Sequence, residues 1–279
     1  MLDSIPNVPV GQWVEAIVSF IQNNFAPVLD GITHIVNFTL SNLEFGLKET
    51  PVLVLALLLS GLAWWLAGRN VGLFTFFGLL LVHNFGLWTS AMETLAMVVV
   101  STTIALFIGI PLGIWASQNN IVNSFIRPML DLMQTMPPFV YLIPAVFFFD
   151  IGRVPGVMAT VIFSMPPAIR LTNLGIRQVP EELIEAANAF GSTVKQKLLK
   201  VQLPSAMPTI MAGVNQCIML ALSMVVIAAM IGGAGLGREV MRGINRLNIG
   251  LGAEAGLAVV IIAIMLDRIT ESLGQSSKK

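Results

Sequence analysis

The sequence predicts an all-α polytopic membrane protein, and three observations support this fold class. Charged residues make up 11% of the 279 residues, less than half of the roughly 25% typical of soluble domains. Mean hydropathy is +0.83. Long apolar runs recur along the chain without alternating, which disfavours a β-barrel. The net charge of zero implies no overall attraction to nucleic acid, and the single cysteine excludes a disulfide scaffold.

The N-terminal segment, residues 1–50, is amphipathic rather than uniformly apolar. Apolar residues recur at helical spacing from Val10 to Phe25, and the pattern returns after Pro27. This predicts two amphipathic helices that lie in the membrane interface or pack on the bundle. We interpret the segment as a packing scaffold, and a docking surface for a partner is the alternative.

Residues 51–273 contain the predicted membrane spans, and residues 274–279 form a short tail. A helix needs about 20 mostly apolar residues to cross a hydrocarbon core of roughly 30 Å. Helices are expected throughout, because lipid offers no partner to an unpaired backbone group. The seven predicted spans are 51–67, 71–88, 91–116, 128–149, 155–175, 205–231 and 252–273.

The distribution of Lys and Arg predicts how the spans are oriented. With the polar stretch 176–204 in the cytoplasm, ten of the 15 Lys and Arg residues lie inside or at the inner boundary. The N-terminus is then outside and the C-terminus cytoplasmic. Arg238, Arg242 and Arg246 lie outside, against the rule, and the sequence offers no reason for their placement.

The polar stretch 176–204, which we call the elbow, predicts two short helices that meet at a glycine. Pro180 begins the first helix in a tolerated position, and acidic residues follow where the helix dipole favours them. Gly191 ends this helix, because the residue after a helix often needs a positive φ. A Ser or Thr directly after the glycine can cap the second helix, and Pro204 is expected to end it.

One face of the first elbow helix is apolar. Leu183, Ala186, Ala187 and Phe190 follow one another at helical spacing. The two alanines add little side-chain bulk, and a simple connection between two spans does not require such helices. The elbow is therefore predicted to insert into a groove on another protein.

Glycine positions suggest where helices break or approach closely. The stretch 232–237 lacks the GxGxxG spacing of a nucleotide site, and it is predicted to break the sixth span. Two pairs of glycines four residues apart permit close approach of neighbouring helices, although such spacing is common by chance in a chain with 24 glycines. These pairs are Gly109 with Gly113 and Gly252 with Gly256.

No reactive set of side chains is visible in the sequence. His34 and His83 are far apart and Cys217 has no cysteine partner, so neither a metal cluster nor a nucleophile–base pair is predicted. The GxxxxGK[ST] pattern is absent, so ATP is not bound by that route and energy must come from a partner or an ion gradient. Asp131 and Arg170 are predicted to form a structural pair near the inner boundary.

The elbow resembles the EAA motif of ABC importer permeases, whose pattern is EAA-x3-G-x9-I-x-LP. The spacing matches throughout, and the one departure is a conservative valine at 201. The resemblance implies a type I importer fold and no enzymatic activity or cofactor in this chain, with ATP and Mg²⁺ on the partner. It also implies a second permease copy, two ATP-binding subunits and an external solute-binding protein as partners. The residues implied to contact the ATPase or set the exit from the elbow are Glu185, Ala186, Ala187, Gly191, Leu203 and Pro204.

Three further segments resemble the glycine betaine/proline/choline branch of these permeases: 135–144, 164–191 and 230–244. This implies a subunit of an osmoprotectant importer in a bacterial cell membrane. A permease for another amino acid, such as methionine, is the alternative. An ion-coupled secondary transporter would need more acids in the middle of the spans, and a membrane enzyme would need a reactive set.

A Ser/Thr-Met-Pro-Pro pattern occurs twice, at 135–138 and at 164–167. Adjacent prolines remove backbone donors and bend or break a helix. A hinged wall of the solute pathway and a static kink both remain open as interpretations, and the broken helices of other transporters favour the pathway. The candidate pathway residues are Thr135, Met136, Pro137, Pro138, Tyr141, Ser164, Met165, Pro166 and Pro167.

Overall fold

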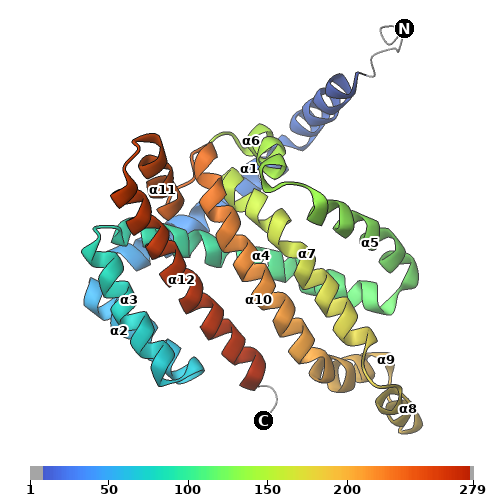
Figure 1. Cartoon of the computed structure of the whole chain (residues 1–279). Helices are drawn as coiled ribbons and strands as arrows, with labels where there is room; N and C mark the ends of the chain where they lie inside the picture. The colour runs from blue at the N-terminus through green and yellow to red at the C-terminus, as the bar shows by residue number, and fades with distance from the viewer. Residues whose placement is uncertain (1–8, 277–279) are drawn as a thin grey trace, which may run out of the picture.

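The computed structural model describes residues 9–276, and the regular secondary structure of that part is helical (Figure 1). Short 3-10 turns at Pro138–Tyr141 and Ala229–Ile231 and a π-helical turn at Leu198–Gln202 join some of the helices. The helices are α1 (Val10–Glu49), α2 (Val52–Ala67), α3 (Arg69–Asn84), α4 (Trp88–Gln118), α5 (Asn120–Thr135), α6 (Leu142–Phe149), α7 (Arg153–Arg177), α8 (Glu181–Ala189), α9 (Val194–Lys197), α10 (Leu203–Ala228), α11 (Leu236–Asn245) and α12 (Ile249–Ser276).

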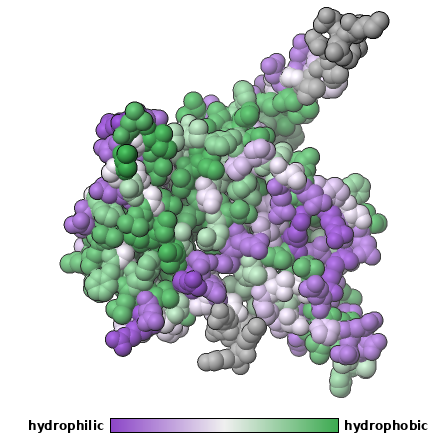
Figure 2. Space-filling model, viewed as in Figure 1, coloured by the Kyte–Doolittle hydropathy of each residue, from purple (hydrophilic) through white to green (hydrophobic). Residues whose placement is uncertain are grey.

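The bundle has two distinct ends. The short helices α8 and α9 lie at one end, which we call the elbow end, and α6 and α11 lie at the other, which we call the far end (Figure 1). In Figure 2, hydrophobic residues cover much of the surface over α2, α3 and the far end, whereas hydrophilic residues gather over the elbow and the α5 side. Such an uneven surface is expected of a membrane protein whose polar faces meet water or a partner.

Within the described residues 9–276, four helical runs are long and apolar enough to cross a membrane: α4, α7, Val194–Ile231 and Ile249–Ser272. Two bent pairs bring the number to six if each is counted as one span: α1 with α2 at 108°, and α5 with Pro138–Phe149 at 112°. The all-helical membrane fold is therefore confirmed, whereas the count of seven spans is not. The helices α2 and α3 have 16 residues each, which is about 24 Å and shorter than the hydrocarbon core.

Helix α7 forms the centre of the bundle between α4 and α10, and glycines permit this close packing. A Cβ on Gly113 would lie 2.7 Å from the carbonyl oxygen of Ile169, and a Cβ on Gly213 would lie 3.1 Å from that of Pro167. The first glycine pair from the sequence therefore lies at a real helix contact. The second pair, Gly252 and Gly256, has nothing within 4 Å of either added Cβ.

The N-terminal segment forms one helix of 40 residues, so the prediction of two amphipathic helices is wrong. Pro27 lies inside α1 without ending it. Pro27 leaves the carbonyl of Asn23 without its helical donor. Asn23 is exposed, so this carbonyl can accept a hydrogen bond from outside the chain. The first half of α1 projects from the body (Figure 1), while Val36 and Leu40 further along are buried in the core.

The two Met-Pro-Pro motifs behave differently, although their local sequences match. At the first motif, Met136 and Pro137 are extended, with ψ of 134° and 143°, and the chain turns sharply between α5 and α6. The predicted break of the 128–149 span at its adjacent prolines is therefore present, and the two pieces can count as one bent span. At the second motif, α7 runs without a break from Arg153 to Arg177, so the expectation that these prolines bend or break the helix is not met.

The sixth span ends where the glycine-rich stretch begins, as predicted. The 3-10 turn Ala229–Ile231 is followed by Gly232 with φ of +85°, and α11 begins at Leu236. The backbone N–H groups of Gly235 and Leu236 are hydrogen-bonded to side chains of α4. The break therefore directs α11 back across the far end of α4.

Candidate functional site: the elbow

The first arm of the elbow is α8, and a glycine turn ends it. Pro180 precedes Glu181 and Glu182 in the first turn, as the sequence predicts. Gly191 has φ of +71°. Its N–H donates to the carbonyl of Asn188 at 2.9 Å, and the next N–H donates to the carbonyl of Ala187 at 3.0 Å. These two bonds form a Schellman motif, so the predicted glycine corner is present.

The second arm of the elbow leads directly into the sixth span. Thr193 and Gln196 form a reciprocal capping box at the start of α9. The helix then passes through a π-helical turn into α10, and Val194–Ile231 is one helical run of 38 residues. The expectation that Pro204 ends the second helix is therefore wrong. Pro204 instead lies in the first turn of α10, just after the π turn, which relieves the strain that a proline causes in a regular helix.

The elbow exposes an uneven apolar surface at the end of the bundle. Glu185 and Ala186 are exposed, Phe190 is 90% exposed, and Val194 is 68% exposed. Ala187, which the sequence places on the same face, is only 7% exposed, so little of it is accessible to a partner. A large exposed phenylalanine beside alanine and valine at the end of a helical hairpin is suited to a protein groove.

Of the two residues implied to set the exit from the elbow, Leu203 is partly buried and Pro204 is exposed. Leu203 packs against a small core that contains Ile176 and Ala206. This core joins the end of α7 to the start of α10. The exit from the elbow is therefore fixed by packing between the two helices that the elbow connects.

Polar contacts join the elbow to neighbouring helices. Arg177 at the end of α7 donates to the carbonyl of Ala116 and to Oδ1 of Asn120, both at 2.9 Å. Gln118 of α4 donates to Oε1 of Gln202 at 3.1 Å. The two arms also contact each other through Lys197 and Asn188, at 3.1 Å. A force on the elbow would thus reach α4 and α5 as well as α7 and α10.

The first Met-Pro-Pro motif is stabilised by Tyr141. Because Pro137 has no N–H, it leaves the carbonyl of Met133 without its helical donor. The hydroxyl of Tyr141 donates to this carbonyl, and the Tyr141 ring lies edge-on to Phe163, with centroids 5.6 Å apart. Tyr141 is buried, so its observed role is to satisfy the broken backbone rather than to face an open path.

The structure separates the other candidate pathway residues into two sets. At the first motif, Thr135 and Pro137 are exposed and Met136 and Pro138 are partly buried. At the second motif, most of the side chains are enclosed between α4 and α10. Those that are buried are Ser164, Pro166 and Pro167, and Met165 is partly buried. Of the two motifs, only the first therefore offers exposed side chains in this conformation.

A network of ion pairs at the far end was missed in the sequence. Three buried carboxylates belong to it: Glu44, Glu93 and Glu239. Lys48 lies 2.8 Å from Glu93, and Arg153 lies 2.7 Å from Glu44. The network joins α1, α4 and α7, elements that lie far apart in the sequence.

The same network accounts for two of the three unexplained arginines. Arg238 lies 3.1 Å from Glu93, and Arg242 lies 2.9 Å from Glu239. Glu93 also accepts the backbone N–H of Gly235 at 2.9 Å. These arginines are therefore neutralised and hold α11 on the bundle. The only signal in the sequence was the excess of arginines on the wrong side.

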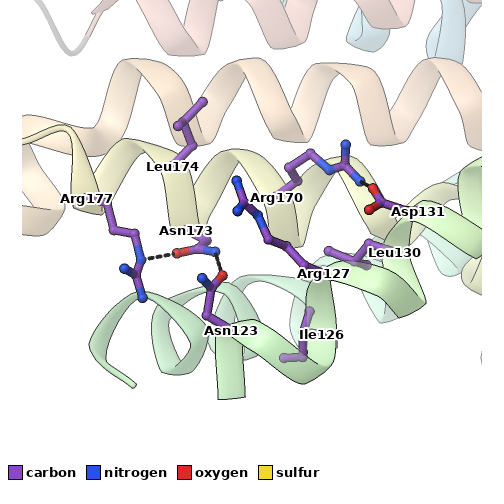
Figure 3. A pocket seen from close by; sticks show the side chains of 9 residues that line it. All are labelled: Asn123, Ile126, Arg127, Leu130, Asp131, Arg170, Asn173, Leu174 and Arg177. Atoms are coloured by element: carbon purple, nitrogen blue, oxygen red, sulfur yellow. Dashed lines mark hydrogen bonds and ion pairs between the residues drawn. The ribbon is translucent and has the colours of Figure 1, made fainter. Parts of the chain in front are cut away.

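The predicted pair of Asp131 and Arg170 is present, with 2.6 Å between Oδ1 and Nη2. It joins α5 to the half of α7 that leads to the elbow (Figure 3). Both side chains are largely exposed, at 65% for Asp131 and 43% for Arg170. The pair therefore lies at the edge of an open surface and not in the core.

A helical membrane bundle that ends in an elbow of this sequence and shape defines a membrane subunit of a solute transport system. The chain belongs to the family described as binding-protein-dependent transport system inner membrane component, whose profile matches residues 109–277.

Curated relatives match nearly the whole chain. It is 50% identical over 277 residues to the glycine betaine transport system permease protein OpuAB of Bacillus subtilis (strain 168), covering 99% of this chain and 98% of that protein. It is 47% identical to the glycine betaine/proline betaine transport system permease protein ProW of Escherichia coli (strain K12), covering 97% of this chain and 77% of that protein.

A solved structure shows the same fold. An inward-facing conformation of the MetNI methionine ABC transporter matches with a TM-score of 0.63 and 21% identity, covering 69% of this chain and 96% of that chain. At this identity the likeness shows the fold alone. The predicted type I importer fold is thus confirmed.

Proposed function

We propose that this chain is the membrane-spanning permease subunit of an ATP-driven bacterial importer for quaternary-amine osmoprotectants such as glycine betaine. The names of the relatives that match nearly the whole chain support the solute class. The observation that carries the mechanism is the elbow, whose exposed Phe190 and Val194 form a surface for another protein.

The proposed assembly has two copies of this chain, two ATP-binding subunits and an external solute-binding protein, surrounded by membrane lipid. ATP and Mg²⁺ belong to the ATP-binding subunits, and this chain supplies no cofactor site or enzymatic activity. The contact with the ATP-binding subunit is made by Glu185, Ala186 and Phe190, while Gly191 fixes the angle between the two arms. Ala187 contributes by packing the elbow and not by direct contact.

In the proposed orientation the elbow end is cytoplasmic, the N-terminus is outside and the C-terminus is cytoplasmic. The excess of Lys and Arg near the elbow end supports this arrangement. The far-end arginines no longer oppose it strongly, because Arg238 and Arg242 form ion pairs with buried carboxylates. A neutralised arginine has less tendency to remain on the cytoplasmic side than a free one.

Movement passes from the elbow to the spans along continuous structure. Closure of the ATP-binding subunits on ATP would shift the elbow, and α9 carries the shift into α10 because the two form one helical run. The first Met-Pro-Pro motif packs against both α7 and α10, through Phe163 and Met224. A shift of α10 relative to α7 would therefore change the position of Met136 and Pro137 at the surface of the solute path.

The test is to express this chain with its candidate ATPase and solute-binding protein in proteoliposomes. We expect uptake of labelled glycine betaine that requires both ATP and the external protein. Uptake driven by a proton or sodium gradient without the ATPase would contradict the proposal. Uptake of methionine instead of glycine betaine would retain the mechanism and replace the solute.

A further inference from the structure

A polar pocket of about 560 Å³ lies between α5 and α7. Figure 3 shows Asn123 and Arg127 of α5 facing Asn173 and Arg177 of α7. Three arginines line it: Arg127, Arg170 and Arg177. A volume of this size is within the range of ordinary small-molecule sites.

The pocket has an excess of positive charge. Its three arginines face one carboxylate, Asp131, which gives a net charge of +2 (three minus one). Asp131 pairs with Arg170. Arg177 donates to neutral groups, which are the amide oxygens of Asn173 and Asn120 and a backbone carbonyl. Two guanidinium groups therefore have no counter-charge.

Arg127 is the most available of the three arginines. In the part of the chain that the structure describes it makes no ion pair and no hydrogen bond with another side chain. Figure 3 shows its side chain extending from α5 across the pocket toward α7, where its guanidinium lies between Asn173 and Arg170. An unpaired guanidinium beside an amide group is suited to hold an oxyanion by two parallel hydrogen bonds.

The position of the pocket indicates that it faces water rather than lipid. Arg170 precedes the end of α7 by seven residues, which places it about 10 Å inside that end. Exposed charges at this depth are unfavourable against hydrocarbon. Helix α5 also has an exposed apolar stripe that does not line the pocket. It is formed by Ile121, Phe125, Met129 and Leu132. Helix α5 thus has one side suited to lipid and another suited to an aqueous path.

We infer that the pocket between α5 and α7 binds the carboxylate of a small zwitterionic solute on the cytoplasmic half of the path, with Arg127 as the principal contact. This rests on the proposed function, because glycine betaine carries one carboxylate and one trimethylammonium group. None of the residues that line the pocket is aromatic, so it offers no ring face to the trimethylammonium group. Recognition here is of the acidic end of the solute alone.

The first experiment measures modification of individual arginines by phenylglyoxal in the purified transporter, followed by mass spectrometry, at constant ionic strength and without ATP. We expect glycine betaine and acetate each to slow the modification of Arg127 at least threefold, and choline to have no effect. Arg69 is the internal control, because it is exposed and lies outside the pocket. Equal protection by choline, or no protection by any of the three, would overturn the inference.

Two further outcomes also count against the site. If Arg127 fails to react even without solute, another copy or subunit covers it. If vesicles that contain phosphatidylglycerol protect it fully, and vesicles of phosphatidylcholine do not, a lipid phosphate occupies the pocket.

The second experiment measures uptake by Arg127→Gln, Arg127→Lys and the matched control Arg69→Gln. We expect Arg127→Gln to lower the maximal rate about fivefold at unchanged KM, because the external protein sets the apparent affinity. Arg127→Lys should retain most of the rate, and Arg69→Gln all of it. Equal rates for Arg127→Gln and Arg69→Gln would overturn the inference. The arginine modification needs no transport, so protection without uptake would contradict the proposed function alone, and uptake without protection would contradict this site alone.

Discussion

Replacement of Gly191 separates the backbone geometry of the elbow from its proposed contact with the ATP-binding subunit. Gly191 has φ of +71°, and nothing lies within 4 Å of a Cβ built on it. A side chain at this position therefore meets no neighbour in the chain itself, and the folding cost is the backbone strain of about 1–2 kcal/mol for an L-residue in the left-handed region. Asn tolerates this region better than Ala.

Gly191→Asp and Gly191→Asn have nearly the same shape and differ in charge. If the elbow sits in an apolar groove of the ATPase, the aspartate loses water without gaining a partner. We expect this to weaken ATPase binding by about 2 kcal/mol relative to Gly191→Asn, or roughly 30-fold in affinity. Gly191→Ala changes the backbone strain alone, so its affinity for the ATPase should be close to that of Gly191→Asn.

The assay is binding of the purified ATPase to each variant in nanodiscs, with uptake measured in parallel. Membrane insertion and thermal unfolding should be similar for all three variants, since the strain is small. Wild-type ATPase affinity in Gly191→Asp would refute the reasoning. A loss in Gly191→Ala as large as in Gly191→Asp would show instead that backbone strain, and not the groove, controls coupling.

The remaining predictions concern stability. Glu93→Gln removes a negative charge that pairs with two cations, and it should lower the free energy of unfolding by about 3 kcal/mol. This loss should appear as a lower Tm, whereas the control Arg246→Gln, which lies outside the network, should leave Tm unchanged. Equal Tm values for the two variants would argue against the network. Gly113→Ala places a Cβ 2.7 Å from a backbone oxygen of α7 and should lower Tm, while Gly256→Ala should not. A lower Tm for Gly256→Ala than for Gly113→Ala would mean that the packing is misassigned. Tyr141→Phe leaves a carbonyl unpaired and should destabilise by about 1–2 kcal/mol, and an unchanged unfolding midpoint would mean that this carbonyl has another donor.

The elbow could be predicted from the sequence because its signals are local. Pro180 and Gly191 act through the backbone of their own turn, and Thr193 forms a capping box with a residue three positions later. None of these features depends on distant parts of the chain. The elbow also contains the family motif. The sequence of this one segment therefore predicted both the elbow and the fold.

The features that the sequence did not predict depend on tertiary contacts. The two Met-Pro-Pro motifs have the same local pattern, yet only the first breaks its helix. The second is enclosed by α4 and α10, and packing there outweighs the loss of two backbone hydrogen bonds. Pro27 and Pro204 likewise remain within helices, because exposure in one case and a π turn in the other accommodates them. The far-end network joins Glu44 to Arg153 across 109 positions, which no local pattern reveals.

The packing of α10 on α7 decides what movement the elbow can produce. Gly175 and Gly213 lie at this contact, where an added Cβ would meet backbone oxygens at 3.2 and 3.1 Å. Side-chain atoms lie closer still, since the same Cβ atoms would be 2.9 Å from Cβ of Thr209 and 3.0 Å from Cβ of Leu171, so the two helices are closely packed. At the same time Arg177 holds the end of α7 to the α4–α5 corner. A force on the elbow would therefore act on α7 and α10 together, and the first Met-Pro-Pro motif, which contacts both, lies where their movement would act on the proposed solute path.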